Sequence, residues 1–237
     1  MKSLTISNRL FSESVWQRMF ETSAIRLEEK RASFFKSMAS LENLRETADY
    51  DTGSITSASA WALYCTAYYF QPLTTLEIGT FIGRSTLSIA MGMDDAGISG
   101  GTIHTCDLSN DIKLPEATKT KITQYPKQSS TDMLKTLIAT LGQTNKFEMI
   151  HIDGRLQDQD CKFLDKIRSP EMIIALDDYE SLEKGVANHM NLKDAGILEH
   201  YQFVYPTSEA LLQKFGFKDH STTALLLPKF LIQHTSQ

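Results

Sequence analysis

The chain has 237 residues, of which 41% are hydrophobic and 22% are charged, with a formal net charge of -5. These proportions are typical of a globular domain and exclude intrinsic disorder and collagen-like repeats. The negative balance offers no general attraction to nucleic acid or to anionic lipid, so neither is an expected partner.

Helical spacing of apolar residues marks the amino-terminal part of the chain. From Ser14 to about Leu44 these residues recur mostly every three or four positions, which predicts helical segments. A second helix is predicted over Ser54–Phe70, where Gln71-Pro72 ends it. We therefore expect residues 1–52 to form a helical extension, acting as a cap or a dimerisation element, and residues 53–237 to form one domain.

After Pro72, short apolar runs alternate with amphipathic stretches. Strands are predicted at Leu73–Gly79, Thr102–Asp107, Ile122–Lys127, Phe147–Asp153, Met172–Asp177, Gln202–Tyr205 and Thr222–Leu227. Helices are predicted at Gly83–Met93, Thr131–Leu141, Gln157–Ile167 and Glu180–Asn191. This order predicts an α/β fold with a mostly parallel seven-stranded sheet and helices on both faces. Only the short segment Glu209–Lys214 separates the last two strands, which favours an antiparallel strand near the carboxyl terminus.

Several predicted strands carry acidic residues at their carboxyl ends, the edge where ligands bind in open α/β sheets. The first has the spacing E-x-G-x-x-x-G, formed by Glu77, Gly79 and Gly83. The glycines permit a tight turn and let the next helix begin near the sheet. Glu77 would repel a pyrophosphate but attract a cationic amino-acid group, which disfavours a nicotinamide-dependent oxidoreductase. Asp107 ends the next strand, where a carboxylate can accept both ribose hydroxyls, although a helix cap is the alternative.

With these residues the chain resembles the class I S-adenosylmethionine-dependent methyltransferases, and among them the metal-dependent catechol and caffeoyl-CoA O-methyltransferases. The resemblance runs from about Gly53 to the carboxyl terminus and implies a Rossmann-like fold. It implies that Asp107 holds the ribose and that Ser130 and Thr131 lie near the adenine, with a simple helix cap as the alternative for that pair. The cofactor-binding residues implied by the resemblance are Glu77, Gly79, Thr80, Gly83, Ser85, Asp107, Ser130, Thr131 and Asp153.

The resemblance also implies a divalent cation site. Asp153 ends one apolar strand, and Asp177 and Asp178 end the next. Three oxygen donors suit a hard cation, Mg²⁺ above all, and a dication would offset their mutual repulsion. Asp178 stands where the similar enzymes have an amide. The alternative is that Asp153 is structural and that Asp177 and Asp178 cap the following helix.

We therefore expect O-methylation of a small molecule, with Asp153 and Asp177 as catalytic residues that act through the cation. The general base is not identified, because Leu156 occupies the position where the similar enzymes often have Lys or His. The alternatives are a metal-independent N- or O-methyltransferase and a catalytically silent cofactor-binding protein. His151 is expected to be a packed core residue, and Lys184 to lie on a solvated helix face.

The remaining expectations concern location and assembly. The amino terminus lacks the apolar core of a signal peptide, and no apolar run approaches the ~20 residues of a membrane span. Cys65, Cys106 and Cys161 are odd in number and widely spaced, as reduced thiols in a cytoplasmic protein would be. The apolar amino-terminal helices make a homodimer plausible.

Overall fold

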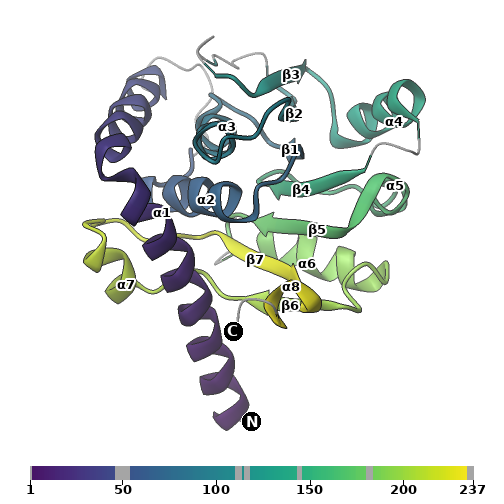
Figure 1. Ribbon diagram of the computed structural model, residues 1–237. Coiled ribbons are helices and arrows are strands. Elements are labelled where there is room, and N and C mark those ends of the chain that lie inside the picture. Colours follow the sequence, from purple (N-terminus) through teal and green to yellow (C-terminus); the bar gives the residue numbers. More distant parts are fainter. Residues whose placement is uncertain are drawn as a thin grey trace.

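The computed structural model describes residues 2–45, 54–109, 114, 118–142, 146–179 and 184–233, and it shows a central sheet between two layers of helices (Figure 1). The strands are β1 (Thr74–Ile78), β2 (Thr102–Asp107), β3 (Lys121–Pro126), β4 (Phe147–Ile152), β5 (Arg168–Leu176), β6 (Tyr201–Val204) and β7 (Ala224–Pro228). Their spatial order is β3-β2-β1-β4-β5-β7-β6. The predicted seven-stranded, Rossmann-like sheet is confirmed.

Strand direction changes only in the last part of this sheet. The pairs β3–β2, β2–β1, β1–β4 and β4–β5 are parallel. β7 lies between β5 and β6 and runs antiparallel to both of them. The predicted antiparallel strand near the carboxyl terminus is therefore present, inside the sheet and not at its edge.

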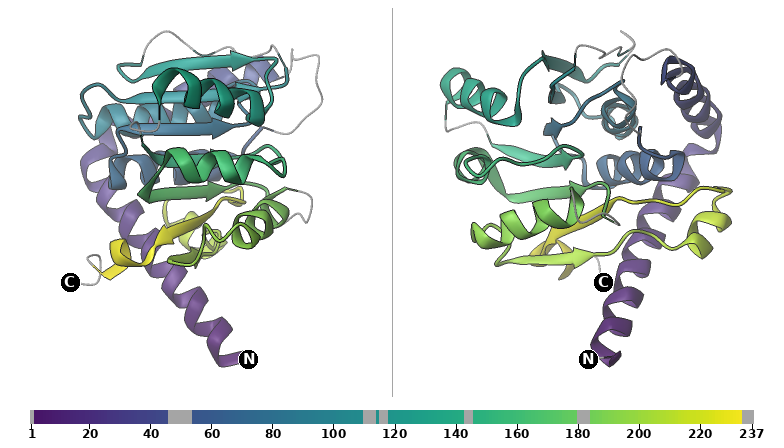
Figure 2. Two further views of the ribbon diagram at one scale, coloured as in Figure 1. Left: turned by 90° about the vertical axis from the view of Figure 1, so that its right-hand side faces the viewer. Right: turned by 180° about the vertical axis from the view of Figure 1, so that it is seen from behind.

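Helices cover both faces of the sheet, as the alternating sequence pattern predicts. They are α1 (Lys2–Arg45), α2 (Ser57–Phe70), α3 (Arg84–Asp95), α4 (Ser130–Leu141), α5 (Asp160–Ile167), α6 (Gly185–Asp194), α7 (Glu209–Lys214) and α8 (Lys229–Gln233). Helices α1, α2 and α3 lie on one face, and α4, α5 and α6 lie on the other (Figures 1 and 2).

Each strand contributes side chains to two separate hydrophobic cores, because successive side chains point to opposite faces of the sheet. In β4, Met149 is buried among residues of α1, α2 and α3, whereas Ile150 is buried among residues of α4 and α5. Ile173 and Ile174 divide in the same way in β5. Burial on both faces explains why these strands appear in the sequence as continuous apolar runs.

The amino-terminal helix belongs to the first of these cores. Trp16, Phe20 and Phe34 of α1 are buried; Phe20 and Phe34 pack against Trp61 of α2, and Trp16 packs against Phe20. The Trp16 Nε1 donates a hydrogen bond to the carbonyl oxygen of Tyr205, at 2.7 Å. The first turns of α1 extend beyond the body of the protein (Figure 1). Helix α1 thus shares a core with the sheet domain, and the division of the chain at residues 52 and 53 stays a prediction.

The predicted boundaries differ from the structure by more than three residues in three places. α1 begins at Lys2 and not at Ser14, and β5 begins at Arg168 and not at Met172. The helix predicted to begin at Glu180 begins at Gly185, and residues 180–183 lie outside the described residues. In the described part of the chain, no helix has the length and apolar composition that would carry it through a bilayer.

Candidate functional site

The backbone brings the acidic strand ends together at one edge of the sheet. The N–H groups of Asp153 and Gly154 both donate to the carbonyl oxygen of Ile78, at 2.9 Å each. The Asp177 N–H donates to the carbonyl oxygen of Ile152 at 3.0 Å. Hydrogen bonding between neighbouring strands therefore continues past their ends and fixes Asp153 and Asp177 beside the turn that follows β1.

That turn depends on glycine. Gly79 has a φ of 95°, and a Cβ added there would lie 2.9 Å from the Gly154 nitrogen. Gly83, with a φ of 85°, is the residue before α3, so the helix begins directly at the turn. Gly79 thus lets the backbone pass close to the Asp153-Gly154 segment, and Gly83 lets α3 begin at the turn, the two roles that their spacing predicts.

Thr80 and Ser85 flank this turn with buried side chains. The Thr80 hydroxyl is hydrogen-bonded to that of Thr105 on β2. Ser85 lies in the first turn of α3, next to Arg84, whose guanidinium donates to the Ser57 hydroxyl at 2.7 Å. The residues predicted to surround the methionine part of the cofactor therefore lie together between β1 and α3. Their contact with a cofactor stays a prediction.

Glu77 lies one layer beneath this turn, inside β1, and its side chain is completely buried. Its carboxylate accepts hydrogen bonds from the hydroxyls of Thr86 and Thr105, the latter at 2.6 Å. Its Oε1 lies 3.2 Å from the Nδ1 of His151 on β4. The carboxylate predicted to attract a cationic group is thus bonded to three side chains of the protein itself.

His151 is the packed core residue that its sequence position predicts. Burial lowers the pKa of the imidazole, but the hydrogen bond and charge of Glu77, with the charges of Asp177 and Asp153, raise it above its ordinary value. Its Nε2 is buried and has no hydrogen-bond partner in the described part of the chain. A positive charge on this ring would lie directly beneath the acidic edge and would favour ionised carboxylates there.

Asp107 fastens the glycine turn to the end of β2. One carboxylate oxygen accepts from the Phe81 N–H at 2.7 Å, and the other accepts from the Ser109 N–H at 2.7 Å. The side chain is only half-buried, so the carboxylate still faces solvent at the edge where a ribose is predicted to bind. A carboxylate oxygen can accept more than one hydrogen bond, so these contacts are compatible with that role.

Ser130 and Thr131 connect two helices. Their hydroxyls donate to the completely buried carboxylate of Asp160 in α5, each at 2.5 Å. The cap of α4 is Ser129, whose hydroxyl accepts from the Asp132 N–H at 3.2 Å. The helix-cap interpretation thus applies to Ser129, and the predicted adenine contact of the other two residues stays a prediction.

The other three acids form a compact group. Asp153, Asp177 and Asp178 each offer a ligand oxygen, and these oxygens all lie within 4.8 Å of one another. We call these three residues the carboxylate trio. Asp177 is buried, and its Oδ1 accepts hydrogen bonds from Thr222 at 2.7 Å and from Thr223 at 2.9 Å. The two threonines directly precede β7 and are far from Asp177 along the sequence. The sequence pattern alone therefore did not reveal their contact with this carboxylate.

Lys184 contacts the carboxylate trio, which corrects the expectation that this side chain lies on a solvated face. Its Nζ is 2.9 Å from the Asp178 Oδ2 and 3.3 Å from the Asp153 Oδ1. The pKa of Lys184 is raised, because the Asp153 and Asp178 carboxylates outweigh the lowering effect of burial. Burial and the Asp177 charge raise the pKa of Asp153 to about 7, although His151 and Lys184 act in the opposite direction.

The donor set of the trio fits a divalent cation. Three carboxylates are the hard oxygen ligands that Mg²⁺, Mn²⁺ and Ca²⁺ take. A positively charged group, the Lys184 ammonium, already lies between two of them, as a stand-in for such an ion. Asp153 and Asp178 remain partly exposed, so the site is open to solvent.

Leu156 occupies the position where the similar enzymes often have the Lys or His of a general base, and its side chain is buried. Its N–H donates to the Asn188 Oδ1 at 3.0 Å, and the Asn188 Nδ2 donates to the Gly154 carbonyl at 2.8 Å. Asn188, in α6, therefore holds the segment that follows Asp153. Leu156 itself provides packing and no proton acceptor at its side chain.

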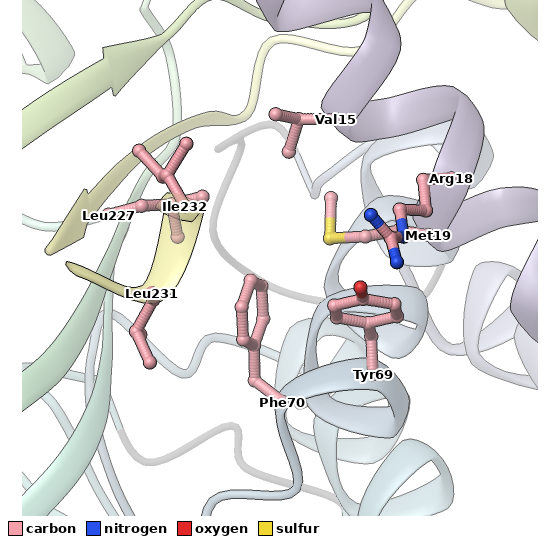
Figure 3. Close-up of a pocket in the computed structure, with 8 residues that line it drawn as sticks. All are labelled: Val15, Arg18, Met19, Tyr69, Phe70, Leu227, Leu231 and Ile232. Atoms are coloured by element: carbon pink, nitrogen blue, oxygen red, sulfur yellow. The ribbon is translucent and has the colours of Figure 1, made fainter. Parts of the chain in front are cut away.

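A small apolar cavity lies elsewhere in the molecule (Figure 3). Its lining residues are Val15, Arg18, Met19, Tyr69, Phe70, Leu227, Leu231 and Ile232. Phe70 ends α2, whereas Ser59 near the beginning of α2 is hydrogen-bonded to Thr222 beside Asp177. At ~1.5 Å per residue the two ends of α2 are about 20 Å apart. The cavity volume of about 20 Å³ has room for about one water molecule. It is separate from the acidic edge.

Comparison with known proteins relates this geometry to a chemical activity. Residues 76–179, from β1 through Asp177 and Asp178, match the family model of a methyltransferase domain. No curated protein matches the chain by sequence.

Among solved structures, the O-methyltransferase TomG from Streptomyces achromogenes, involved in tomaymycin synthesis and in complex with SAM, is similar. It shares 17% identity, with 81% of this chain and 89% of that chain covered and a TM-score of 0.59. An O-methyltransferase from Bacillus cereus in complex with SAH shares 15% identity, with 91% and 99% covered and a TM-score of 0.58. These two chains share the fold described here.

Proposed function

We propose that this chain, of which residues 76–179 match the methyltransferase-domain model, is a class I methyltransferase that transfers a methyl group from S-adenosylmethionine to a hydroxyl group of a small molecule with the assistance of a divalent cation. The observation that carries the proposal is the carboxylate trio, whose ligand oxygens lie within 4.8 Å of one another beside the glycine turn. The glycine turn and the trio lie at the same edge of the sheet, which supports a cofactor site and a cation site side by side.

The cofactor part of the proposal rests on Gly79, Gly83 and Asp107. Gly79 lets the turn pass close to the Asp153-Gly154 backbone, Gly83 lets α3 begin directly at the turn, and Asp107 presents a carboxylate at the end of the next strand. The acidic edge would attract the positively charged sulfonium donor. The relatives that hold SAM or SAH have the same fold, which supports this cofactor.

The cation part of the proposal rests on how firmly the trio is held. Asp177 is fixed by Thr222 and Thr223, and Asp153 is fixed by backbone hydrogen bonds to Ile78. When bound, a divalent cation would anchor the acceptor hydroxyl and favour its deprotonated form. The remaining acceleration comes from alignment of the acceptor oxygen, methyl carbon and sulfur, which these fixed side chains favour.

Binding of the product cofactor tests the nucleoside site. We expect Asp107→Ala to weaken S-adenosylhomocysteine binding at least about tenfold in titration calorimetry, since a hydrogen bond to a charged group contributes ~1.5–3 kcal/mol. Asp165→Ala, which removes an exposed carboxylate paired with Arg168, is the matched control and should bind normally. Unchanged affinity in Asp107→Ala, or preferential binding of NAD, would contradict the proposal.

Turnover tests the catalytic part. Activity on a panel of hydroxylated small molecules should be lost in EDTA and restored by Mg²⁺. Asp177→Asn should lose activity while it still binds S-adenosylhomocysteine. Cofactor binding without turnover on any acceptor would favour a catalytically silent protein.

A metal-independent N- or O-methyltransferase is the second candidate, and Lys184 favours it. An ammonium between Asp153 and Asp178 already supplies a positive charge to the trio. Full activity after exhaustive EDTA treatment would select this candidate.

Location and assembly complete the proposal. The three cysteines are all buried and free, which supports a reducing compartment such as the cytoplasm. We propose that residues 1–52 act as a cap or dimerisation element with a second copy of the chain, since Leu10 is 68% exposed on the protruding end of α1. Light scattering after size-exclusion chromatography, with Leu10→Glu as the variant, tests the dimer.

A further inference from the structure

Lys184 occupies an unusual place for a surface lysine. It is the residue before α6, and its side chain reaches back to the ends of β4 and β5, where it bridges two members of the carboxylate trio. The Lys184 side chain is 35% exposed, and those of Asp153 and Asp178 are 16% and 36% exposed, so the ion pair with Asp153 is the better shielded from water. Contacts of this kind are stronger than ordinary surface pairs because solvent screens them less.

We propose that the Lys184 ammonium is a tethered competitor of the divalent cation, so that cation binding to the trio requires Lys184 to leave and the affinity for the cation is set by this residue. The inference rests on the cation part of the proposed function and adds to it a residue that determines how tightly the cation binds.

The argument begins with space and charge. The ammonium lies 2.9 Å and 3.3 Å from two oxygens that a cation would need. A cation bound to the same oxygens would lie within a few ångströms of the ammonium, where two positive charges repel each other strongly. The trio therefore holds either the ammonium or the dication between Asp153 and Asp178.

The exchange has a definite thermodynamic consequence. Binding of the cation requires the two Lys184 ion pairs to break. The observed affinity is therefore the affinity of the free trio multiplied by the fraction of molecules in which the trio is free. Three carboxylates with one ammonium retain a net charge of -2, so a dication is still attracted. Lys184 thus weakens cation binding without abolishing it, and it keeps the carboxylates compensated when no cation is bound.

Mn²⁺ binding to the full-length, cofactor-free protein tests this exchange. Binding is measured by electron paramagnetic resonance of free Mn²⁺ at pH 8. Lys184→Met should bind Mn²⁺ about tenfold more tightly than the wild type, the order expected when two partly shielded ion pairs no longer have to be broken. Lys184→Arg retains the charge and should bind with nearly wild-type affinity.

Lys193→Met is the matched control. It removes the same charge from the last turn of the same helix, α6, on an exposed side chain away from the trio. Its Mn²⁺ affinity should stay within about twofold of the wild type. An equal gain in both methionine variants would show an effect of net charge alone and would overturn the role of Lys184.

Thermal unfolding provides a second measurement that does not depend on Mn²⁺ spectra. In EDTA, Lys184→Met should unfold at a lower temperature than the wild type, because Asp153 and Asp178 then lose their ion pairs, and Mg²⁺ should raise its Tm more than it raises that of the wild type. Equal Mn²⁺ affinities in the wild type and Lys184→Met would overturn this inference and leave the proposed function intact. Cofactor binding by proteins that all fail to bind Mn²⁺ would refute the cation part of the proposed function and this inference with it.

Discussion

Glu77 and His151 face each other across β1 and β4, with 3.2 Å between the Glu77 Oε1 and the His151 Nδ1 and with both side chains completely buried. The pair lies directly below the strand ends that carry Asp153 and Asp177. Glu77 is therefore not exposed within the site. It binds His151 beneath the site and supports the site from the core of the sheet.

The first prediction concerns this pair. Glu77→Gln removes the group that raises the pKa of His151, so burial should then lower it. Since a raised folded-state pKa stabilises below the unfolded value of ~6.5 and is lost as the pH rises through the folded value, the variant should be destabilised more at pH 6 than at pH 9. A loss of about 3 kcal/mol at pH 6 is expected. Urea unfolding at both pH values, with Glu171→Gln as an exposed control, measures it; a loss that does not vary with pH would contradict the pairing.

The second prediction concerns Asp153, whose pKa is raised to about 7. The folded protein keeps this proton until about pH 7, whereas the unfolded chain loses it at pH ~3.9, so stability falls as the pH rises from about 4 to about 7. The unfolding free energy of Asp153→Asn minus that of the wild type should therefore be larger at pH 8 than at pH 4. The expected increase is roughly 1–3 kcal/mol in EDTA. The exposed Asp165→Asn should show no such difference. A gain that is the same at both pH values would mean that Asp153 is ionised throughout.

The third prediction compares two glycines with positive φ. In Gly79→Ala the new Cβ would meet the Gly154 nitrogen at 2.9 Å, whereas Gly97→Ala meets nothing within 4 Å. Both pay for the left-handed backbone, about 1 kcal/mol, but only Gly79→Ala must also displace the Asp153-Gly154 segment. We expect Gly79→Ala to unfold at a clearly lower urea concentration and to bind S-adenosylhomocysteine poorly. Equal behaviour of the two variants would refute the close approach.

The fourth prediction separates two roles for Thr131. Its hydroxyl donates to the buried Asp160 at 2.5 Å, so Thr131→Ala should lower the unfolding free energy by about 1–3 kcal/mol. Thr140→Ala loses an exposed bond to the Thr136 carbonyl and should have little effect. An adenine contact would appear as a loss of S-adenosylhomocysteine affinity that persists at temperatures where the variant is fully folded. Loss of affinity with no loss of stability would contradict the structural role.

The strands could be predicted because their buried residues form short apolar runs in the sequence. The apolar run of β4 and the acid that ends it lie where the sequence predicts, and β2 matches over its whole length, Thr102–Asp107. β5 was predicted to begin too late, because its first residues, from Arg168 to Glu171, are polar or proline and are paired only at the rim of the sheet. Periodicity detects burial, and these residues are not buried.

The site was predictable only where its residues follow strands directly. The convergence of Asp153, Asp177 and Asp178 follows from parallel strands that end at one edge. Lys184, Thr222 and Asn188 were missed because they reach the trio or its supporting segment from other elements, through side-chain geometry that spacing does not encode. The burial of Glu77 was missed for a related reason, since its partners Thr105 and His151 lie on separate strands.

The position of β7 in the sheet has a consequence for how the chain folds during synthesis on the ribosome. β7 is translated after every other strand, yet it occupies an interior place in the sheet, and the threonines that hold Asp177 immediately precede it. A nascent chain therefore exposes the open flank of β5 until residues 222–228 have left the exit tunnel. A chain truncated before residue 222 would leave β5 unpaired on this side and Asp177 without the hydrogen bonds from the two threonines.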